Sequence, residues 1–312
     1  MATSYCEIPI NYSDIEPFVL SDVETMKKLF FQSKRLVFYD ACSFQRHSYL
    51  DEREMQILIK YYKMHNSAII IIRGVLIELV GEHHILNQSQ IKLIKRLHDN
   101  QIEVVIFSEE YLFDILSECF SDKQRINEYL MWAIRNVKSP VSTIERTLAE
   151  NLELSEELLK AKNLRKTDLY QKFFCSVRDN KEKDDDLGED LIALCVHILS
   201  NLPGTNNGKL CVVTDDRKAA IKINSAIRKK SKDDFATKII LFSTAKLVQH
   251  IYQEQIDISE DEMIKILSSG LNGNIVVMGI TDYDLDVNPK ISLTCKQLAQ
   301  KIRETNEIVV IF

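Results

Sequence analysis

Carboxylates are the residues of this 312-residue sequence whose positions most clearly suggest chemistry. Asp40 and the adjacent Asp215 and Asp216 each follow a short apolar run that is typical of a buried strand. Glu78 and Asp190 lie near the starts of segments with helical periodicity. In an open parallel sheet the ligand site lies beyond the carboxyl ends of the strands, so we expect these acids to meet at that edge.

Such a set of acids, without His or Cys partners, predicts a site for hard cations. Mg²⁺ and Mn²⁺ prefer oxygen ligands and keep bound waters, which leaves room for substrate phosphates. One or two of these ions would polarise a scissile phosphate and activate a water molecule for attack. The acids therefore indicate hydrolysis of a phosphodiester, with Mg²⁺ or Mn²⁺ as the cofactor.

The overall charge places a condition on any nucleic-acid substrate. The chain has 40 Lys and Arg against 46 Asp and Glu, a net charge of -6, which disfavours binding through a globally basic surface. We expect a local basic patch in the helical segment that follows Asp216. Its members are Lys222, Arg228, Lys229, Lys230 and Lys232. The alternative is a solvated helix end, where basic residues are favourable near the negative pole of the helix.

The elements that must position these residues follow from hydrophobic periodicity. Apolar runs predict strands over 35–40, 68–72, 102–108, 209–214 and 237–243, each followed by helical spacing. Strands that alternate with helices in this way predict an α/β fold with a parallel sheet. The strand signal disappears between about 119 and 188, which predicts a helical insertion in a domain spanning 1–256.

The last stretch, 257–312, is expected to form a C-terminal α/β extension. It is either a small appended unit or a set of extra strands on the main sheet. Within it, 281–293 is expected to be a polar loop that contains Asp282, Asp284 and Asp286. In the main domain, Ser89 is the expected N-cap of the helix over 89–101.

The cysteines and the N-terminus bear on the compartment. The 7 cysteines are scattered without a CxxC pair, which favours a reducing environment and no structural zinc. The N-terminal residues lack a basic region and an apolar core, and no window approaches the roughly 20 apolar residues of a membrane span. We therefore expect a cytoplasmic protein without membrane contact. His83 and His84 are expected to be a loop pair, and Cys42 a small buried residue.

Taken in order, several segments resemble the PIN-domain superfamily of metal-dependent nucleases, which includes the ribonucleases of bacterial toxin–antitoxin pairs. These segments are LVFYDAC, IIIIRGVLIELVG, EVVIFSEEYLFDIL, GEDLIALCVHIL and LCVVTDDRKAAI. The resemblance covers roughly residues 34–250, with 119–188 as an insertion, and implies a three-layer α/β/α fold around a parallel sheet. The chain is well over twice the length of a minimal member, and its last 60 or so residues have no counterpart there.

The resemblance also implies a role for each acid. The four metal-binding and catalytic acids of that family correspond, in chain order, to Asp40, Glu78, Asp190 and Asp216. Glu189 is the less favoured neighbour at the third position. The fourth acid follows Thr214 by two residues, which leaves Asp215 as an auxiliary metal ligand.

The expected function is that of a metal-dependent nuclease, acting on RNA more readily than on DNA by analogy with the family. The alternative is a catalytically silent module of the same fold that scaffolds a complex. A phosphatase that uses Asp40 as nucleophile ranks well behind, because the haloacid-type pattern needs a second Asp where this chain has Cys42. A free nuclease must be restrained, so a protein inhibitor or activator is expected to bind the helical insertion. The oligomeric state is left open.

Overall fold

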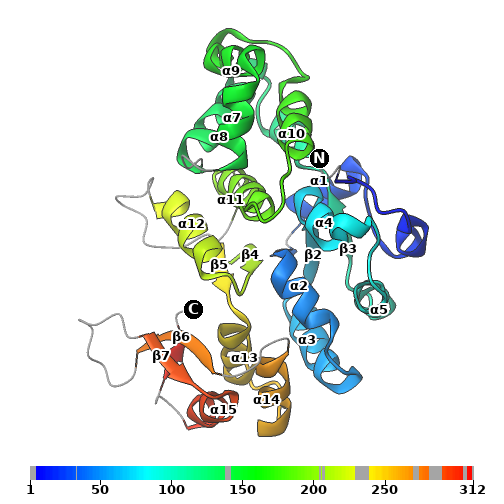
Figure 1. Ribbon diagram of the computed structural model, residues 1–312, viewed down its shortest axis with the longest axis vertical. Helices are drawn as coiled ribbons and strands as arrows, with labels where there is room; N and C mark the ends of the chain where they lie inside the picture. Colours follow the sequence, from blue (N-terminus) through cyan, green and yellow to red (C-terminus); the bar gives the residue numbers. More distant parts are fainter. Residues whose placement is uncertain are drawn as a thin grey trace.

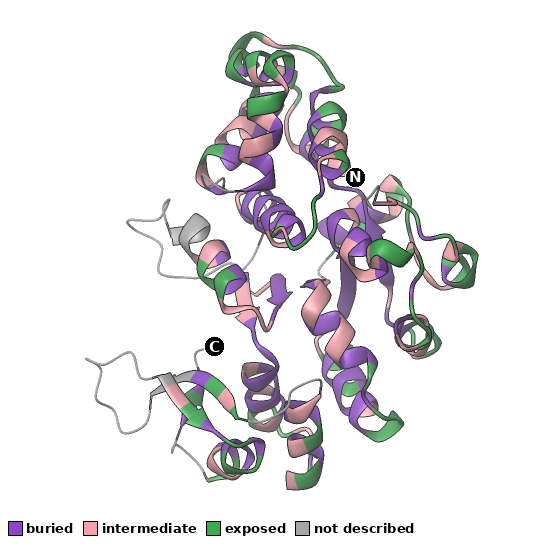
Figure 2. Cartoon of the chain, in the orientation of Figure 1, coloured by how far each residue is buried: buried purple, intermediate pink, exposed green. Residues whose placement is uncertain are grey.

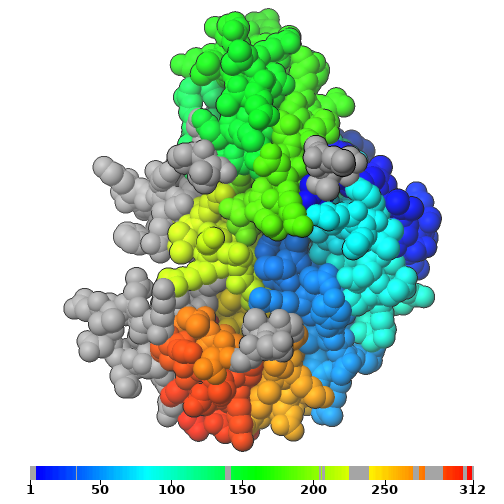
Figure 3. Space-filling view, in the orientation of Figure 1, coloured from blue at the N-terminus to red at the C-terminus, as the bar shows by residue number. Residues whose placement is uncertain are grey.

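The computed structural model describes residues 5–32, 34–137, 142–203, 205, 208–228, 239–269, 274–280, 290–304 and 308–310. Figure 1 shows a central sheet with a helical lobe at one end of the molecule and a small unit of C-terminal residues at the other. The space-filling view shows the same division, with the lobe in green and the C-terminal unit in orange and red (Figure 3).

Five parallel strands form the central sheet, and each lies where an apolar run predicted it. They are β1 (Arg35–Tyr39), β2 (Ser67–Ile72), β3 (Val104–Phe107), β4 (Leu210–Val213) and β5 (Ile239–Phe242). Helices cover both faces of the sheet, so nearly every strand residue is buried. This is why the strands are continuous apolar runs and do not alternate with polar residues.

The strand order, β3-β2-β1-β4-β5, decides where the helices lie. The chain adds β2 and β3 on one side of β1 and then returns to add β4 and β5 on the other. Crossovers between parallel strands are right-handed, so the two halves place their helices on opposite faces. One face carries α2 (Ala41–Ser48), α3 (Glu52–Met64), α5 (Gln88–Asp99) and α13 (Thr244–Gln253), and the other carries α11 (Leu187–Ser200) and α12 (Arg217–Arg228). The expected three-layer α/β/α arrangement is confirmed, and the order reverses between β1 and β4.

The helical insertion forms the lobe at the top of Figure 1. After α6 (Leu112–Cys119) it contains α7 (Lys123–Val137), α8 (Thr143–Glu150), α9 (Leu152–Leu159) and α10 (Leu169–Asp179). A buried guanidinium joins it to the sheet, because Arg178 of α10 lies 2.6 Å from Glu109 and 3.0 Å from Glu110, in the turn after β3. The same side chain lies 2.7 Å from Glu7 in the N-terminal segment.

The N-terminal segment covers an edge of the sheet. It contains short turns, η1 (Tyr12–Asp14) and η2 (Glu16–Phe18), and then α1 (Val23–Phe31). Between η2 and α1, Leu20 pairs with Val105 of β3. Its backbone N–H donates to the carbonyl of Val104, and its carbonyl accepts the N–H of Ile106, each at 2.8 Å. An unpaired edge is a template for association with other chains, so this bridge protects β3.

The C-terminal residues form a sheet of their own and add no strand to the main one. After α14 (Glu260–Ser268) come β6 (Ile275–Ile280), β7 (Lys290–Leu293), α15 (Cys295–Arg303) and β8 (Val309–Val310), and the strands pair antiparallel in the order β7-β6-β8. α14 packs against α3, and Gln249 of α13 bonds the backbone of Ile308 and Val310. Of the two alternatives left open by the sequence, the appended unit is the one observed.

Two local expectations are wrong. Residues 290–293 form β7 and are not part of a loop. Antiparallel pairing with β6 supplies the hydrogen bonds of this strand, and a four-residue segment with a Lys and a Ser gives no strand signal in the sequence. The N-cap of α5 is Asn87, which forms a capping box with Gln90, while Ser89 is already inside the helix. The acidic residues of 281–289 lie outside the described residues.

Burial follows the three layers (Figure 2). α11 contacts α4 (Arg73–Val80), α7 and α12, and it is buried along almost its whole length. Every residue of α11 is described, and Glu189 is the one that is not buried. None of the described helices is both long and apolar enough to cross a membrane.

Candidate functional site

A cavity of about 360 Å³ opens beyond the carboxyl ends of β1 and β4, where the strand order reverses. This is the position at which open α/β sheets bind ligands. Its charged lining consists of eight acids and two lysines: Asp40, Glu78, Glu82, Asp184, Asp185, Asp186, Glu189 and Asp216, with Lys181 and Lys183. The excess of carboxylates gives the cavity a negative potential, which attracts cations.

Asp40 is fixed at the centre of this edge by the two strands that flank it. It follows β1, and its backbone N–H donates to the carbonyl of Val213 in β4 at 3.0 Å. Its Oδ2 accepts hydrogen bonds from Thr214 Oγ1 at 3.1 Å and from Cys42 Sγ at 2.7 Å. Burial raises the pKa of Asp40, and the same burial and the Asp40 charge raise the pKa of the Cys42 thiol, which therefore stays protonated.

Asp216 lies beside Asp40 because Thr214 holds both. The Thr214 hydroxyl donates to Asp40 and accepts the backbone N–H of Asp216 at 3.0 Å. Asp216 Oδ1 in turn accepts the N–H of Lys218 at 2.6 Å, at the start of α12. The Thr that sequence reasoning used only as a position marker is thus a positioning residue for two of the acids.

Glu78 projects from α4 onto the first turn of α11. Its Oε1 accepts the backbone N–H of Gly188 at 2.8 Å, and Lys181 Nζ lies 3.6 Å from the same oxygen. A Cβ atom at position 188 would lie 2.3 Å from Glu78 Oε2, so any side chain there would displace the Glu78 carboxylate. Burial raises the pKa of Glu78 to about 7, against the lowering effect of Lys181. Lys181 was not singled out from the sequence, where it is one of several lysines around an acidic loop.

The third acid in the cavity is Glu189, and Asp190 is not among the lining residues. Asp190 is fully buried and forms an ion pair with Lys222 of α12. Burial, together with the charges of Asp216 and Asp40, raises the pKa of Glu189 to about 8. The structure therefore reverses the order of preference that the sequence suggested for these two neighbours.

Asp215 also lies outside the cavity lining. Its Oδ2 accepts from Ser43 Oγ at 3.0 Å and from Thr244 Oγ1 at 2.7 Å, and its Oδ1 accepts the Thr244 N–H at 2.7 Å. Arg46 approaches it to 3.2 Å. With its oxygens used by α2 and α13, Asp215 joins these helices to β4, and the structure separates it from the other acids.

The expected basic patch cannot be placed. α12 ends at Arg228, whose side chain lies outside the described residues, as do Lys229, Lys230 and Lys232. Lys222 of the same helix faces Asp190.

The cavity acids are spaced more widely than the ligands of one tightly bound ion. Among the described residues, the group of three whose ligand atoms lie within 4.8 Å of one another is a different one, made by His65, His250 and Glu254. Mg²⁺ does not require such a close cluster, because it keeps several waters and takes only one or two carboxylates directly. No protein-family model matches this chain, and neither a curated protein nor a solved structure matches it.

Proposed function

We propose that this chain is a metal-dependent nuclease whose site is formed by Asp40, Glu78, Glu189 and Asp216. The observation that carries the proposal is the meeting of these four carboxylates in one cavity at the reversal point of a parallel sheet. Glu189 takes the place that sequence reasoning gave to Asp190.

The donor set fits Mg²⁺ or Mn²⁺. All four groups offer carboxylate oxygens, and the raised pKa values of Glu78 and Glu189 reflect burial together with repulsion from neighbouring acids. A divalent cation would relieve that repulsion, which is a reason for the cavity to bind one. When bound, the ion would neutralise charge on a phosphodiester and increase the acidity of water.

The chain's own groups set the geometry of the reaction. Thr214 holds Asp40 and Asp216 in fixed relation, and the Gly188 N–H orients Glu78. The protonated Cys42 thiol donates to Asp40 and is not a nucleophile, so water is the attacking group. Because the acids would repel a polyanion, the substrate is expected to enter only when the cation is present. RNA is the favoured polymer by the resemblance to PIN-domain nucleases.

The test is cleavage of end-labelled single-stranded RNA and DNA in Mg²⁺ or Mn²⁺ by the wild type, Asp40→Asn and Asp216→Asn. Each substitution removes a charge at nearly constant volume. An Asp99→Asn variant, changed on the exposed end of α5, is the matched control. We expect metal-dependent cleavage that the two site variants lose and the control retains. Absence of cleavage, or cleavage by all variants, would favour the silent scaffold.

A further inference from the structure

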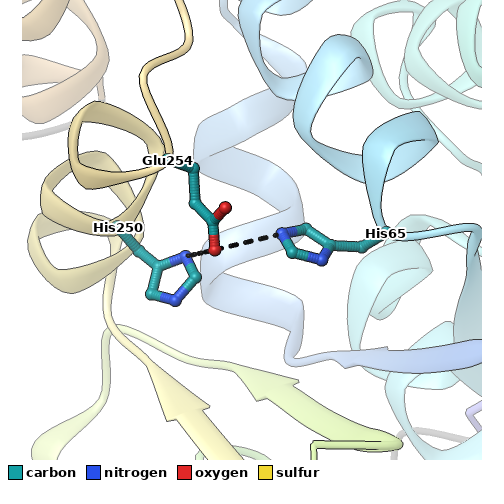
Figure 4. A group of neighbouring side chains, drawn as sticks. All are labelled: His65, His250 and Glu254. Carbon is teal, nitrogen blue, oxygen red and sulfur yellow. Dashed lines mark ion pairs between the residues drawn. The ribbon is translucent and has the colours of Figure 1, made fainter.

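A second group of ligand-type side chains lies at the opposite edge of the sheet from the carboxylate cavity. His65 is the C-cap of α3, just before β2 begins, and His250 and Glu254 lie at the end of α13. Residues four apart share one face of a helix, so His250 and Glu254 point the same way. In Figure 4 the Glu254 carboxylate lies between the two imidazole rings.

The ligand atoms of these three residues lie close enough together for one ion to bind all of them. Glu254 Oε1 lies 3.8 Å from His65 Nε2 and 3.8 Å from His250 Nδ1. One ligand atom from each residue lies within 4.8 Å of the other two. His65 Nε2 is a buried atom that has no hydrogen-bond partner among the described residues.

The surroundings orient these rings. The Tyr61 ring packs edge-on against both imidazoles, with centroids 4.6 Å from His65 and 5.6 Å from His250. The Tyr61 hydroxyl lies 3.1 Å from His250 Nδ1. This hydroxyl bonds the same His250 nitrogen that faces Glu254, so an ion bound to that nitrogen would replace the hydrogen bond.

We propose that His65, His250 and Glu254 bind one divalent transition-metal ion of the zinc class. Two imidazoles and a carboxylate form a three-ligand set that Zn²⁺ uses in proteins, with a further position left for water. Nitrogen donors favour zinc-class ions over Mg²⁺, so this site and the carboxylate cavity would select different metals. The side chains of His250 and Glu254 are 31% and 36% exposed, which leaves the ion a path from solvent.

Such an ion would connect two distant parts of the chain. His65 and His250 come from helices on one face of the sheet that are far apart in sequence, and α13 also carries the C-terminal unit through Gln249. Binding would therefore stabilise the attachment of α13 to α3. In the sequence, the four-residue spacing of His250 and Glu254 is the signal of this group, while the absence of CxxC pairs favours no structural zinc.

The experiment measures Zn²⁺ and Co²⁺ binding to the chelator-treated full chain, by competition with a chromophoric chelator and by the visible spectrum of Co²⁺. The variants are His65→Gln and Glu254→Gln, with His98→Gln, an exposed histidine on α5, as the matched control. We expect one tight equivalent for the wild type, His98→Gln and Asp40→Asn. The affinity of His65→Gln and Glu254→Gln should fall by more than the ~10–100-fold typical of second-shell changes.

Two outcomes would overturn the proposal: no tight equivalent in the wild type, or equal affinity in the wild type and both ligand variants. Thermal unfolding provides a readout that is independent of any activity. Zn²⁺ should raise the Tm of the wild type and of His98→Gln, because a ligand that binds only the folded state stabilises it. The ligand variants, folded as judged by circular dichroism, should show no such rise.

Discussion

Glu189 is half-buried and is repelled by neighbouring acids, and a bound cation would remove the cost of this repulsion to the fold. It is the one residue of α11 that is not buried, and the charges of Asp216 and Asp40 add to the effect of burial on its carboxyl group. Its pKa of about 8 exceeds its ordinary value of 4.5, so the folded state binds the proton more tightly. The stability that this proton contributes is complete below the ordinary pKa and is lost as pH rises through about 8.

We therefore expect Glu189→Gln to raise the Tm by a few degrees without metal, more above about pH 8 than below about pH 5. Mg²⁺ should raise the Tm of the wild type and so reduce the Tm difference between the wild type and Glu189→Gln. The same variant should lose cleavage about 100-fold or more, since it removes a proposed metal ligand. Asp190→Asn is the neighbouring control and should retain cleavage at temperatures where it remains folded. A Glu189→Gln variant that cleaves normally would exclude this residue from the site.

Gly188 gives a second prediction, because there is no room for a side chain between it and Glu78. In a helix Ala is ordinarily better than Gly by about 1 kcal/mol, so a harmless Gly188→Ala change would stabilise the protein. At position 188 the added methyl group must displace the Glu78 carboxylate, so we expect less than this gain in stability and a loss of cleavage of about 10–100-fold. In a Glu78→Gln background the additional loss should be small, as a double-mutant cycle would measure. If the effects of Gly188→Ala and Glu78→Gln on cleavage simply added, Gly188 would not act through Glu78.

The two acids at the start of α11 show why the site was predictable only in part. Adjacent residues of a helix point about 100° apart, so choosing between Glu189 and Asp190 requires the rotation of the helix about its axis. That rotation is set by contacts from other elements, namely Gly188 on Glu78 and Lys222 on Asp190. The positions of Asp40 and Asp216 could be predicted without a helix rotation, because each follows a strand whose end defines the edge of the sheet.

At the scale of elements, the helical lobe depends on one buried charge. The Arg178 side chain is fully buried and meets Glu109, which is also fully buried and accepts the Gly74 N–H at 2.8 Å. Removal of one partner of a buried ion pair leaves the other uncompensated, which typically costs about 3–5 kcal/mol. The pair therefore controls how firmly α10 is attached to the sheet.

We expect Arg178→Met to lower the free energy of unfolding by about 3–5 kcal/mol, measured by denaturant titration. The double variant with Glu109→Gln should recover part of the loss, because it no longer buries a lone carboxylate. Lys160→Met, which breaks an exposed pair with Glu156 in the same lobe, is the control and should cost no more than ~1 kcal/mol. Equal effects of Arg178→Met and Lys160→Met would show that the buried pair does not anchor the lobe.

The elements themselves were largely predictable, for a physical reason. Strands buried on both faces must be apolar throughout, so β1 to β5 were visible as runs such as Ala68 to Ile72. β7 was not, because it is a short strand of an antiparallel sheet whose pairing with β6 depends on residues distant in sequence. The three-ligand set around Glu254 was invisible for the same reason, since His65 joins it only through the fold.

At the scale of the whole molecule, His47 connects the layers and makes stability depend on pH. Its ring nitrogens lie 2.9 Å from the Tyr39 hydroxyl of β1 and 3.0 Å from Thr244 Oγ1 of α13. Burial lowers its pKa from 6.5 to about 4, while Asp215 acts in the opposite direction and Arg46 adds to the lowering. Between these values the unfolded state binds the proton more readily, so stability is complete above about pH 6.5 and falls toward pH 4.

We expect this histidine to contribute up to about 3 kcal/mol to the loss of stability over that range. Unfolding free energies measured at several pH values for the wild type and His47→Gln would test it. The variant is less stable at neutral pH, but its stability should decline less steeply between about pH 6.5 and 4. Parallel declines would show that His47 does not carry the effect.

The hydrogen bond from Thr214 to Asp40 joins residues 174 positions apart. A ribosome therefore releases Asp40 and Glu78 long before the strand that completes their surroundings. While β1 to β3 and the helical lobe emerge, Asp40 and Glu78 lie at this edge of the sheet without Glu189 or Asp216 beside them. The order of synthesis thus delays assembly of the cavity until nearly the whole domain has been translated, so under the proposed function an unfinished chain would lack a complete site.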